Sequence, residues 1–99
     1  MNQDERARSL TDCHLRALLY ERALDDEGRA DARMMLEQAA HLGKLTALEA
    51  NLLIMHYSLG ETLAACGRAY GITGARCLRI ENKALRKLRR VFYSWAVSL

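Results

Sequence analysis

The stretch TLAACGRAYGITGARCLRIENKALRKLRR, residues 62–90, decides the fold. A short helix is predicted over Leu63–Tyr70, and it ends at Gly71 because glycine readily adopts the left-handed conformation that stops a helix. Thr73 then caps a second helix, which begins at Gly74. Two helices joined by a three-residue turn, the second rich in arginine and lysine, are typical of a helix-turn-helix that binds DNA.

The second helix carries its basic and apolar residues on separate faces. Each set is spaced three and four residues apart, so each forms one stripe on an α-helix. At about 100° per residue the two stripes lie about 125° apart, so one can enter a core while the other meets phosphates. The basic stripe is Arg76, Arg79, Lys83, Arg86 and Arg90, and the apolar stripe is Cys77, Ile80, Ala84, Leu88, Val91 and Trp95.

Charge is divided unevenly along the chain, although its net value is only +3. Residues 62–99 hold eight of the fifteen basic residues and a single acid, Glu81, for a net charge of +7. Residues 1–61 hold seven basic and eleven acidic residues, for a net charge of −4. This division favours one surface that meets a polyanion and another that meets a protein. The alternative, merely solvated helix faces, fits less well because the basic residues are not mixed with acids.

Length and composition favour one all-α domain of about five helices with the helix-turn-helix at its C-terminal end. The chain has 99 residues, 51% of them hydrophobic, and no proline. Ala, Leu, Arg and Glu dominate, whereas β-branched residues are scarce. No stretch reaches the roughly 18 to 20 apolar residues of a membrane span. A polar run rather than a secretory signal follows Met1, so we expect a cytoplasmic protein.

Three helices are predicted before the helix-turn-helix. The run Asp25–Gly28 separates the first two, and Gly43 stops the second. The third begins with Thr46 and Glu49, a capping-box pair in which each side chain satisfies a backbone N–H of the first turn. Ser9 or Thr11 is the expected cap of the first helix, and Thr62 that of the fourth. The expected bounds of all five are about 11–24, 30–42, 46–59, 63–70 and 74–98.

Apolar positions identify the expected core. The first helix has a mixed face of Leu15, Leu18, Leu19 and Arg22. The second offers Met34, Met35, Leu36 and Ala39. The third is predicted to be the most buried, through Leu48, Leu52, Ile54, Met55 and Leu59. Five residues of the second half are predicted to be core: Leu52, Leu63, Ile72, Ile80 and Leu88.

The sequence gives little support to catalysis or to a bound cofactor. The three cysteines form no CxxC pair, and the three histidines complete no zinc-ligand spacing with them. We therefore expect no metal, no cofactor and no enzymatic activity, with Cys66 and Cys77 as small buried hydrophobic residues. Glycine-rich phosphate loops and paired carboxylates are not evident either.

Three segments of the second half resemble region 4 of the primary bacterial sigma factors, the sigma-70 family. They are LTALEANLLIMHYSLG at 45–60, TLAACGRAYGIT at 62–73 and RIENKALRKLRR at 79–90. The most specific part, residues 80–89, differs from the family's usual string mainly at Asn82. The resemblance covers roughly Lys44–Arg90. It implies a DNA-binding domain of three or four helices that reads a promoter element in the major groove and touches the RNA polymerase flap.

The chain departs from the family where bases are read. The family normally has an Arg-Glu pair after the turn threonine and later an Arg-Gln pair. Here these positions are Gly74, Ala75, Leu78 and Arg79, of which only the last can donate to a base edge. The phosphate-facing positions are kept, so we expect a firm backbone grip and weak base readout. The expected DNA-binding residues are Arg68, Thr73, Arg76, Arg79, Lys83, Arg86, Lys87 and Arg90.

We divide the chain into an N-terminal helical arm or lid, residues 1–43, and a region 4-like helix-turn-helix with an extended C-terminal helix, residues 44–99. The aromatic tail, residues 91–99, prolongs the fifth helix. We expect Val91, Phe92 and Trp95 to pack on the N-terminal helices, the alternatives being a dimer or polymerase contact and a membrane interface.

Three functions fit these features. The first is a phage-like or accessory transcription regulator that binds double-stranded DNA at or beside bacterial RNA polymerase. The second is a phage antiterminator of the Q type, because His56–Gly60 resembles a segment of those proteins. The third is a region 4 mimic that binds RNA polymerase or a sigma factor with little use of DNA. A homodimer is a further expected partner, and membranes are not.

Overall fold

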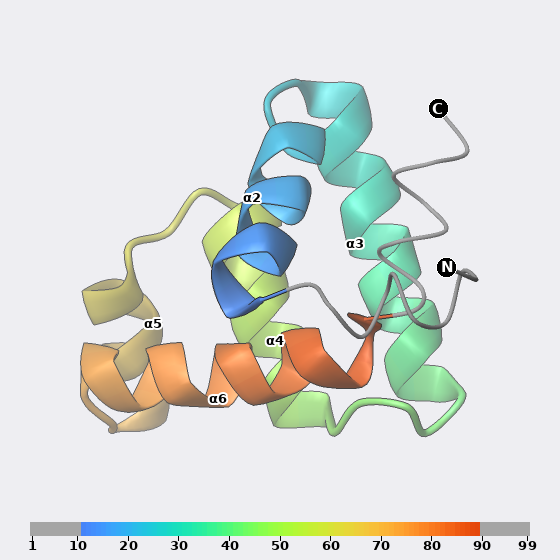
Figure 1. The fold of residues 1–99 in the computed structure, drawn as a ribbon. Coiled ribbons are helices and arrows are strands. Elements are labelled where there is room, and N and C mark those ends of the chain that lie inside the picture. Colours follow the sequence, from blue (N-terminus) through green and yellow to red (C-terminus); the bar gives the residue numbers. More distant parts are fainter. Residues whose placement is uncertain (1–10, 90–99) are drawn as a thin grey trace.

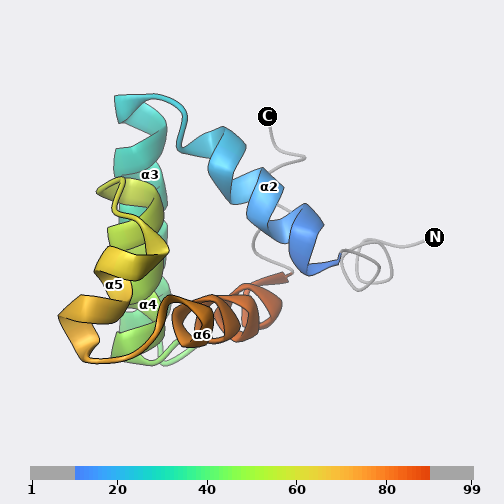
Figure 2. The same cartoon turned by 90° about the vertical axis from the view of Figure 1, so that its left-hand side faces the viewer.

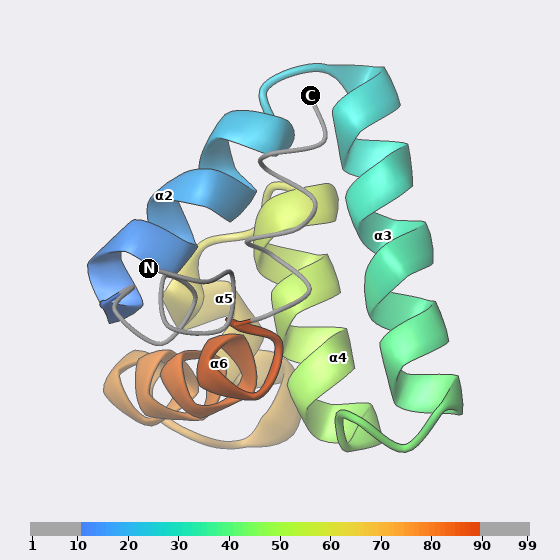
Figure 3. The ribbon, with the colours of Figure 1, turned by 45° about the vertical axis from the view of Figure 1, so that its right-hand side comes forward.

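The computed structural model describes residues 11–89, and these fold into five α-helices and one π-helical turn without a β-strand. The all-α prediction is thus confirmed. In Figures 1 and 3, α3 and α4 lie side by side, α6 crosses the lower part of α4 with α5 at its N-terminal end, and α2 lies above α6. The bounds are α2 Asp12–Arg22, α3 Asp26–His41, α4 Ala47–Leu53, η1 Ile54–Ser58, α5 Leu63–Tyr70 and α6 Gly74–Lys87.

Side-chain caps start every α-helix at a residue that offers an oxygen to the first turn. Thr11 and Thr46 form capping boxes with His14 and Glu49, so the predicted box at the third helix is confirmed. The predicted threonine caps of the last two helices are also confirmed, since Thr62 and Thr73 accept from the backbone of the third helical residue. These local signals set the helix starts because the first turn has no backbone partners of its own.

The start of α3 differs from the prediction. The predicted break between the first two helices exists but lies earlier, since α2 ends at Arg22. Asp25 caps α3, and its Oδ1 accepts from the N–H of Gly28 at 2.6 Å. Gly28 is buried, and a Cβ there would lie 1.7 Å from the carbonyl oxygen of Arg22. Its lack of a side chain lets the end of α2 approach the first turn of α3, which a sequence pattern alone does not reveal.

Two other helix predictions are wrong in detail. The third helix is continuous only to Leu53 as an α-helix, and Ile54–Ser58 widens into a π-helical turn. The fifth helix was predicted to reach Ser98, but α6 ends at Lys87, and Leu88 follows with φ −99° and ψ 13°. The predicted packing of Val91, Phe92 and Trp95 concerns residues outside those that the structure describes.

The larger hydrophobic cluster joins both halves of the chain. Leu15 and Leu19 of α2 and Leu36 of α3 are fully buried in it, together with Leu85 and Leu88 at the end of α6. The N-terminal helices therefore share their core with the helix that follows the turn. Two predicted apolar positions of α4 and η1, Leu52 and Ile54, are buried, whereas Met34, Leu48 and Leu59 are exposed, contrary to expectation.

A smaller cluster lies between α4, α5 and α6. Leu52, Cys66 and Cys77 are fully buried in it, and Leu63, Ile72 and Ile80 pack against it while partly exposed. Of the five residues predicted as core, Leu52 and Leu88 are thus fully buried and the other three lie at the core's edge. The prediction that Cys66 and Cys77 act as small hydrophobic residues is confirmed. Within residues 11–89, no helix is long and apolar enough to cross a membrane.

Candidate nucleic-acid interface

The turn between α5 and α6 has the predicted three residues, Gly71 to Thr73, and a glycine-dependent geometry. Gly71 has φ 67°, a value that favours glycine. Gly67 in the middle of α5 is buried, and a Cβ there would lie 2.4 Å from the carbonyl oxygen of Ile72. The N–H of Ile72 donates to the carbonyl of Gly67 at 2.9 Å. This contact holds α5 close to the turn, which sets how α6 projects from the domain.

The cationic face of α6 consists of exposed side chains. Arg76, Arg79 and Lys83 are exposed, and Arg86 continues the same stripe at the next turn. The opposite face is buried through Cys77, Glu81, Ala84 and Leu85. Arg68 of α5 and the capping residue Thr73 are also exposed. Arg90, the last predicted contact, lies outside the described residues.

Lys87 is engaged within the protein. Its Nζ lies 2.7 Å from Oε1 of Glu49, which is 4% exposed and also caps α4 by accepting from the N–H of Thr46. Burial alone would raise the pKa of Glu49, but the hydrogen bonds from Lys87 and Thr46 outweigh it and lower that pKa. The last turn of α6 is thus fastened to the first turn of α4, away from the cationic stripe's centre.

The positions that correspond to base-reading residues offer few donors. Gly74 and Leu78 are partly buried, Ala75 is exposed, and Arg79 is exposed. A Cβ on Gly74 would meet its nearest neighbours, the backbone of Leu63 and Ala64, at 3.5 Å, which is an ordinary contact. Packing does not require glycine there. Among these four positions only the guanidinium of Arg79 can donate to a base edge.

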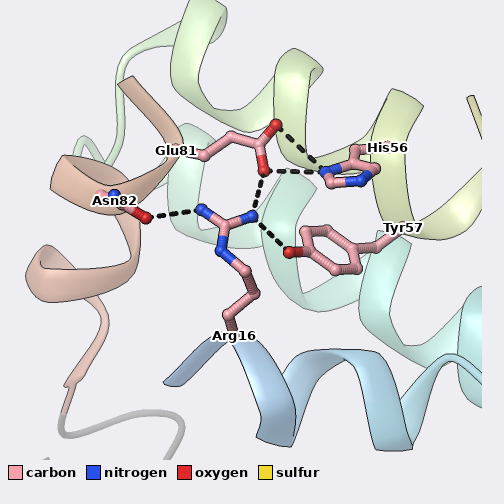
Figure 4. A network of polar contacts seen from close by, with 5 residues as sticks. All are labelled: Arg16, His56, Tyr57, Glu81 and Asn82. Atoms are coloured by element: carbon pink, nitrogen blue, oxygen red, sulfur yellow. Dashed lines mark hydrogen bonds and ion pairs between the residues drawn. The ribbon is translucent and has the colours of Figure 1, made fainter. Parts of the chain in front are cut away.

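A buried polar network lies on the flank of α6 that faces α2 (Figure 4). The side chain of Glu81 is fully buried, and its Oε1 accepts from Nη1 of Arg16 at 2.9 Å and lies 2.9 Å from Nδ1 of His56. Arg16 also donates to the hydroxyl of Tyr57 and to Oδ1 of Asn82. Three helical segments, α2, η1 and α6, therefore meet at one carboxylate.

The electrostatics of this network depend on its charge pair. Burial raises the pKa of Tyr57 to about 12; the charge of Glu81 adds to the shift and that of Arg16 opposes it. Burial would lower the pKa of Arg16, but its bonds to Glu81 and Tyr57 outweigh that cost, so the guanidinium stays charged. A buried carboxylate without such partners would be strongly destabilising.

Sequence reasoning missed this network. From the sequence, Glu81 was noted only as the single acid of residues 62–99, and Arg16 was not identified as a candidate residue. One signal was available, because Glu81 lies between Cys77 and Ala84 on the apolar side of α6, where an acid needs a buried partner. The partner could not be identified, since Arg16 is 65 residues away in the chain. Asn82, the main departure from the family string, now has a role as an acceptor for Arg16.

Other candidate chemistry is weak among residues 11–89. No group of three or more His, Cys, Asp or Glu side chains that could hold a metal ion is found there. Burial raises the pKa of both Cys66 and Cys77, which makes their thiols poor nucleophiles. Cys13 is exposed on α2.

Comparison with known proteins agrees with this geometry. The family described as Sigma-70, region 4 matches residues 41–90, which is slightly more than half of the chain. A search of curated proteins and a search of solved structures found no match. The matched range begins at the last residue of α3 and includes α4, η1, α5 and α6, whereas α2 and the rest of α3 precede it. The chain therefore belongs to the sigma-70 region 4 family, whose hallmark is a DNA-binding helix-turn-helix.

Proposed function

We propose that this protein is a transcription regulator that binds duplex DNA at or beside bacterial RNA polymerase. The observation that carries the proposal is the exposed stripe of Arg76, Arg79 and Lys83 on the second helix of a region 4 helix-turn-helix. Cationic side chains on such a helix supply the phosphate contacts that dominate DNA affinity. The regulator acts by binding in the cytoplasm and not as an enzyme.

Each basic residue has a proposed place in the contact with DNA. Arg76, Lys83 and Arg86 face phosphates, and Arg68 adds a contact from α5. Arg90 stays a predicted contact from the sequence alone, because it lies outside the described residues. The hydroxyl of Thr73 stands at the first turn of α6, where a phosphate can approach. Arg79 is the one candidate for a base contact among the four reading positions. Lys87 adds little attraction for phosphates, because the charge of its ammonium is compensated by Glu49.

The Q-type antiterminator has less support. The segment His56–Gly60 suggested it, but His56 and Tyr57 are explained by their bonds to Glu81 and Arg16 inside the domain. The region 4 mimic has a specific observation in its favour. Gly74, Ala75 and Leu78 provide no side-chain donors, so a protein partner could be more important than base readout.

Retention of RNA polymerase on the immobilised full-length chain separates these functions. The regulator predicts retention that rises when a duplex is added, and loss of that rise in the double variant Arg76→Ala with Lys83→Ala. If the protein is a mimic, the retention of polymerase should be equal with and without DNA. It should also be equal for the parent and for the double variant. Read-through of a terminator in a purified transcription reaction would single out the antiterminator. A chain that retains neither polymerase nor duplex would contradict the proposal.

A further inference from the structure

Helix α2 has a second apolar side that the rest of the described chain, residues 11–89, leaves exposed. Leu15 and Leu19 are fully buried against the core. On the opposite side Cys13, Ala17 and Tyr20 are all exposed, and Leu24 follows in the turn after the helix. Tyr20 is 64% exposed and Leu24 is 65% exposed. A surface helix of a single domain normally has one apolar stripe, so a second one indicates a contact with another chain.

The outer stripe has the spacing of a helix-pairing seam. Cys13, Ala17 and Tyr20 are separated by four and three residues, which is the spacing of the d and a positions of a heptad. Leu24 lies four residues further on, in the turn that follows α2, where its N–H donates to the carbonyl of Glu21. His14 and Glu21 are seven residues apart, beside this seam on one flank, and both are exposed. The other flank, with Arg16, is turned toward the domain's own core. A partner therefore meets the seam and the flank of His14 and Glu21.

We propose that the occupant of this face is α2 of a second copy, packed antiparallel across a two-fold axis. In this register Ala17 lies against the partner's Tyr20, and Cys13 lies against the partner's Leu24. Each small residue thus faces a large one, which packs better than the like-with-like layers of a parallel pair. A two-fold contact uses the same patch on both copies, so one stripe is sufficient.

Charge complementarity supports the antiparallel direction. In an antiparallel pair the equivalent flanks of the two helices adjoin, which brings His14 beside the partner's Glu21, twice per dimer. The capping box orients the imidazole, because Nδ1 of His14 accepts from the N–H of Thr11 at 3.3 Å. The remaining ring nitrogen, Nε2, then carries the proton and can donate to the carboxylate of the partner's Glu21.

The dimer would supply what the recognition helix lacks, and in this respect it rests on the proposed function. Among the four reading positions one copy has a single donor, Arg79, whereas two copies on one duplex double the base and phosphate contacts. In Figure 2 one side of α2 is turned away from α3, α4 and α6, and α2 packs on the flank of α6 that carries Glu81 and Asn82. The cationic stripe therefore stays open in the dimer. A seam of four residues is small, so we expect weak association in solution that strengthens when DNA holds two copies together.

Disulfide trapping tests the register directly. The variant Leu24→Cys places a new thiol opposite the partner's Cys13, while Cys66 and Cys77 are buried and out of reach. Under a mild oxidant at high protein concentration and without DNA, we expect a covalent dimer on a non-reducing gel. The matched controls are Cys13→Ser in the same variant, which should remove the dimer, and Met34→Cys, an exposed position of α3, which should not form it.

Three outcomes would overturn the dimer: no covalent dimer, equal trapping by Met34→Cys, or a dimer that persists after Cys13→Ser. Because the trapping needs no DNA, its result is independent of the proposed function. A second variant, Tyr20→Glu, should abolish cooperative DNA binding while leaving the circular dichroism and the affinity of a single bound copy unchanged. Cooperative binding that survives Tyr20→Glu would also contradict the proposal.

Discussion

At the scale of single residues, Glu81 connects the segment that matches the family to the helix that precedes it. Its carboxylate is fully buried and is held by Arg16 of α2 and His56 of η1. Asn82, beside it, accepts from the same guanidinium. The position at which this chain departs most clearly from the family string is therefore a position at which it contacts its own N-terminal helix.

Arg16→Met should destabilise the fold strongly. Removing one partner of a buried ion pair leaves an uncompensated charge and typically costs about 3–5 kcal/mol. Denaturant unfolding measures this loss, and Arg33→Met, which removes an exposed pair with Glu37 on α3, should change the free energy of unfolding by less than about 0.5 kcal/mol. Adding Glu81→Gln to Arg16→Met should restore part of the loss, because the buried charge is then gone. Equal effects of Arg16→Met and Arg33→Met would show that the network contributes little.

Glu49 should make stability sensitive to acid. Its pKa is lower in the folded than in the unfolded chain, so its contribution is complete at neutral pH and is lost as the pH falls through the acid range, below the ordinary value of about 4.3. Glu49→Gln keeps a side chain that can serve the capping box but removes the charge pair with Lys87. The free energy of unfolding of this variant should therefore fall less between neutral and acid pH than that of the parent. Glu37→Gln, in an exposed pair, serves as the control.

At the scale of helices, local signals were sufficient where the chemistry is local. The caps at Thr46, Thr62 and Thr73 and the stop at Gly71 are recognisable because each involves residues within one turn. The early start of α3 was missed although its cap, Asp25, is also local. Gly28 was interpreted as a helix break, whereas it lies inside α3 because the end of α2 approaches it closely. The end of α6 was also missed, because the apolar spacing of the sequence continues past Leu88 although α6 ends at Lys87.

The candidate site likewise combines features that local sequence predicts with contacts that only the tertiary fold creates. The cationic stripe follows from helical spacing alone, so the exposure of Arg76, Arg79 and Lys83 could be predicted from the sequence. The pairing of Lys87 with Glu49, and that of Arg16 with Glu81, join residues that only the tertiary fold brings together. These long-range pairs decide which charges are available to a partner, and sequence spacing does not contain that information.

Two glycines of the helix-turn-helix should respond oppositely to alanine. Gly67→Ala places a Cβ within 2.4 Å of the carbonyl oxygen of Ile72, so the turn must shift, at a typical cost of about 1–3 kcal/mol. Gly74→Ala meets only ordinary contacts at 3.5 Å and should be neutral or stabilising by at most about 1 kcal/mol, because alanine favours the helix. Thermal unfolding of the two variants provides the comparison. Similar melting temperatures for both would mean that α5 and the turn are packed less closely than described.

At the scale of the whole molecule, the uneven charge of the sequence corresponds to a division of surfaces. The cationic stripe belongs to α6, and the seam proposed for dimerisation belongs to α2, on the other side of the shared core. Leu15, Leu19, Leu85 and Leu88 connect the two helices through that core. In the proposed regulator, DNA and a second copy would therefore occupy different surfaces.

The salt dependence of duplex affinity tests the central claim, DNA binding through α6, most directly. The slope of log affinity against log salt counts the phosphates that the protein neutralises. Arg76→Ala and Lys83→Ala should each reduce the magnitude of this slope by about 1, and together by about 2, with a matching loss of affinity at low salt. Arg33→Ala, which removes an exposed arginine of α3, should leave the affinity and the slope unchanged. A double variant that keeps the parent's affinity and slope would contradict the account.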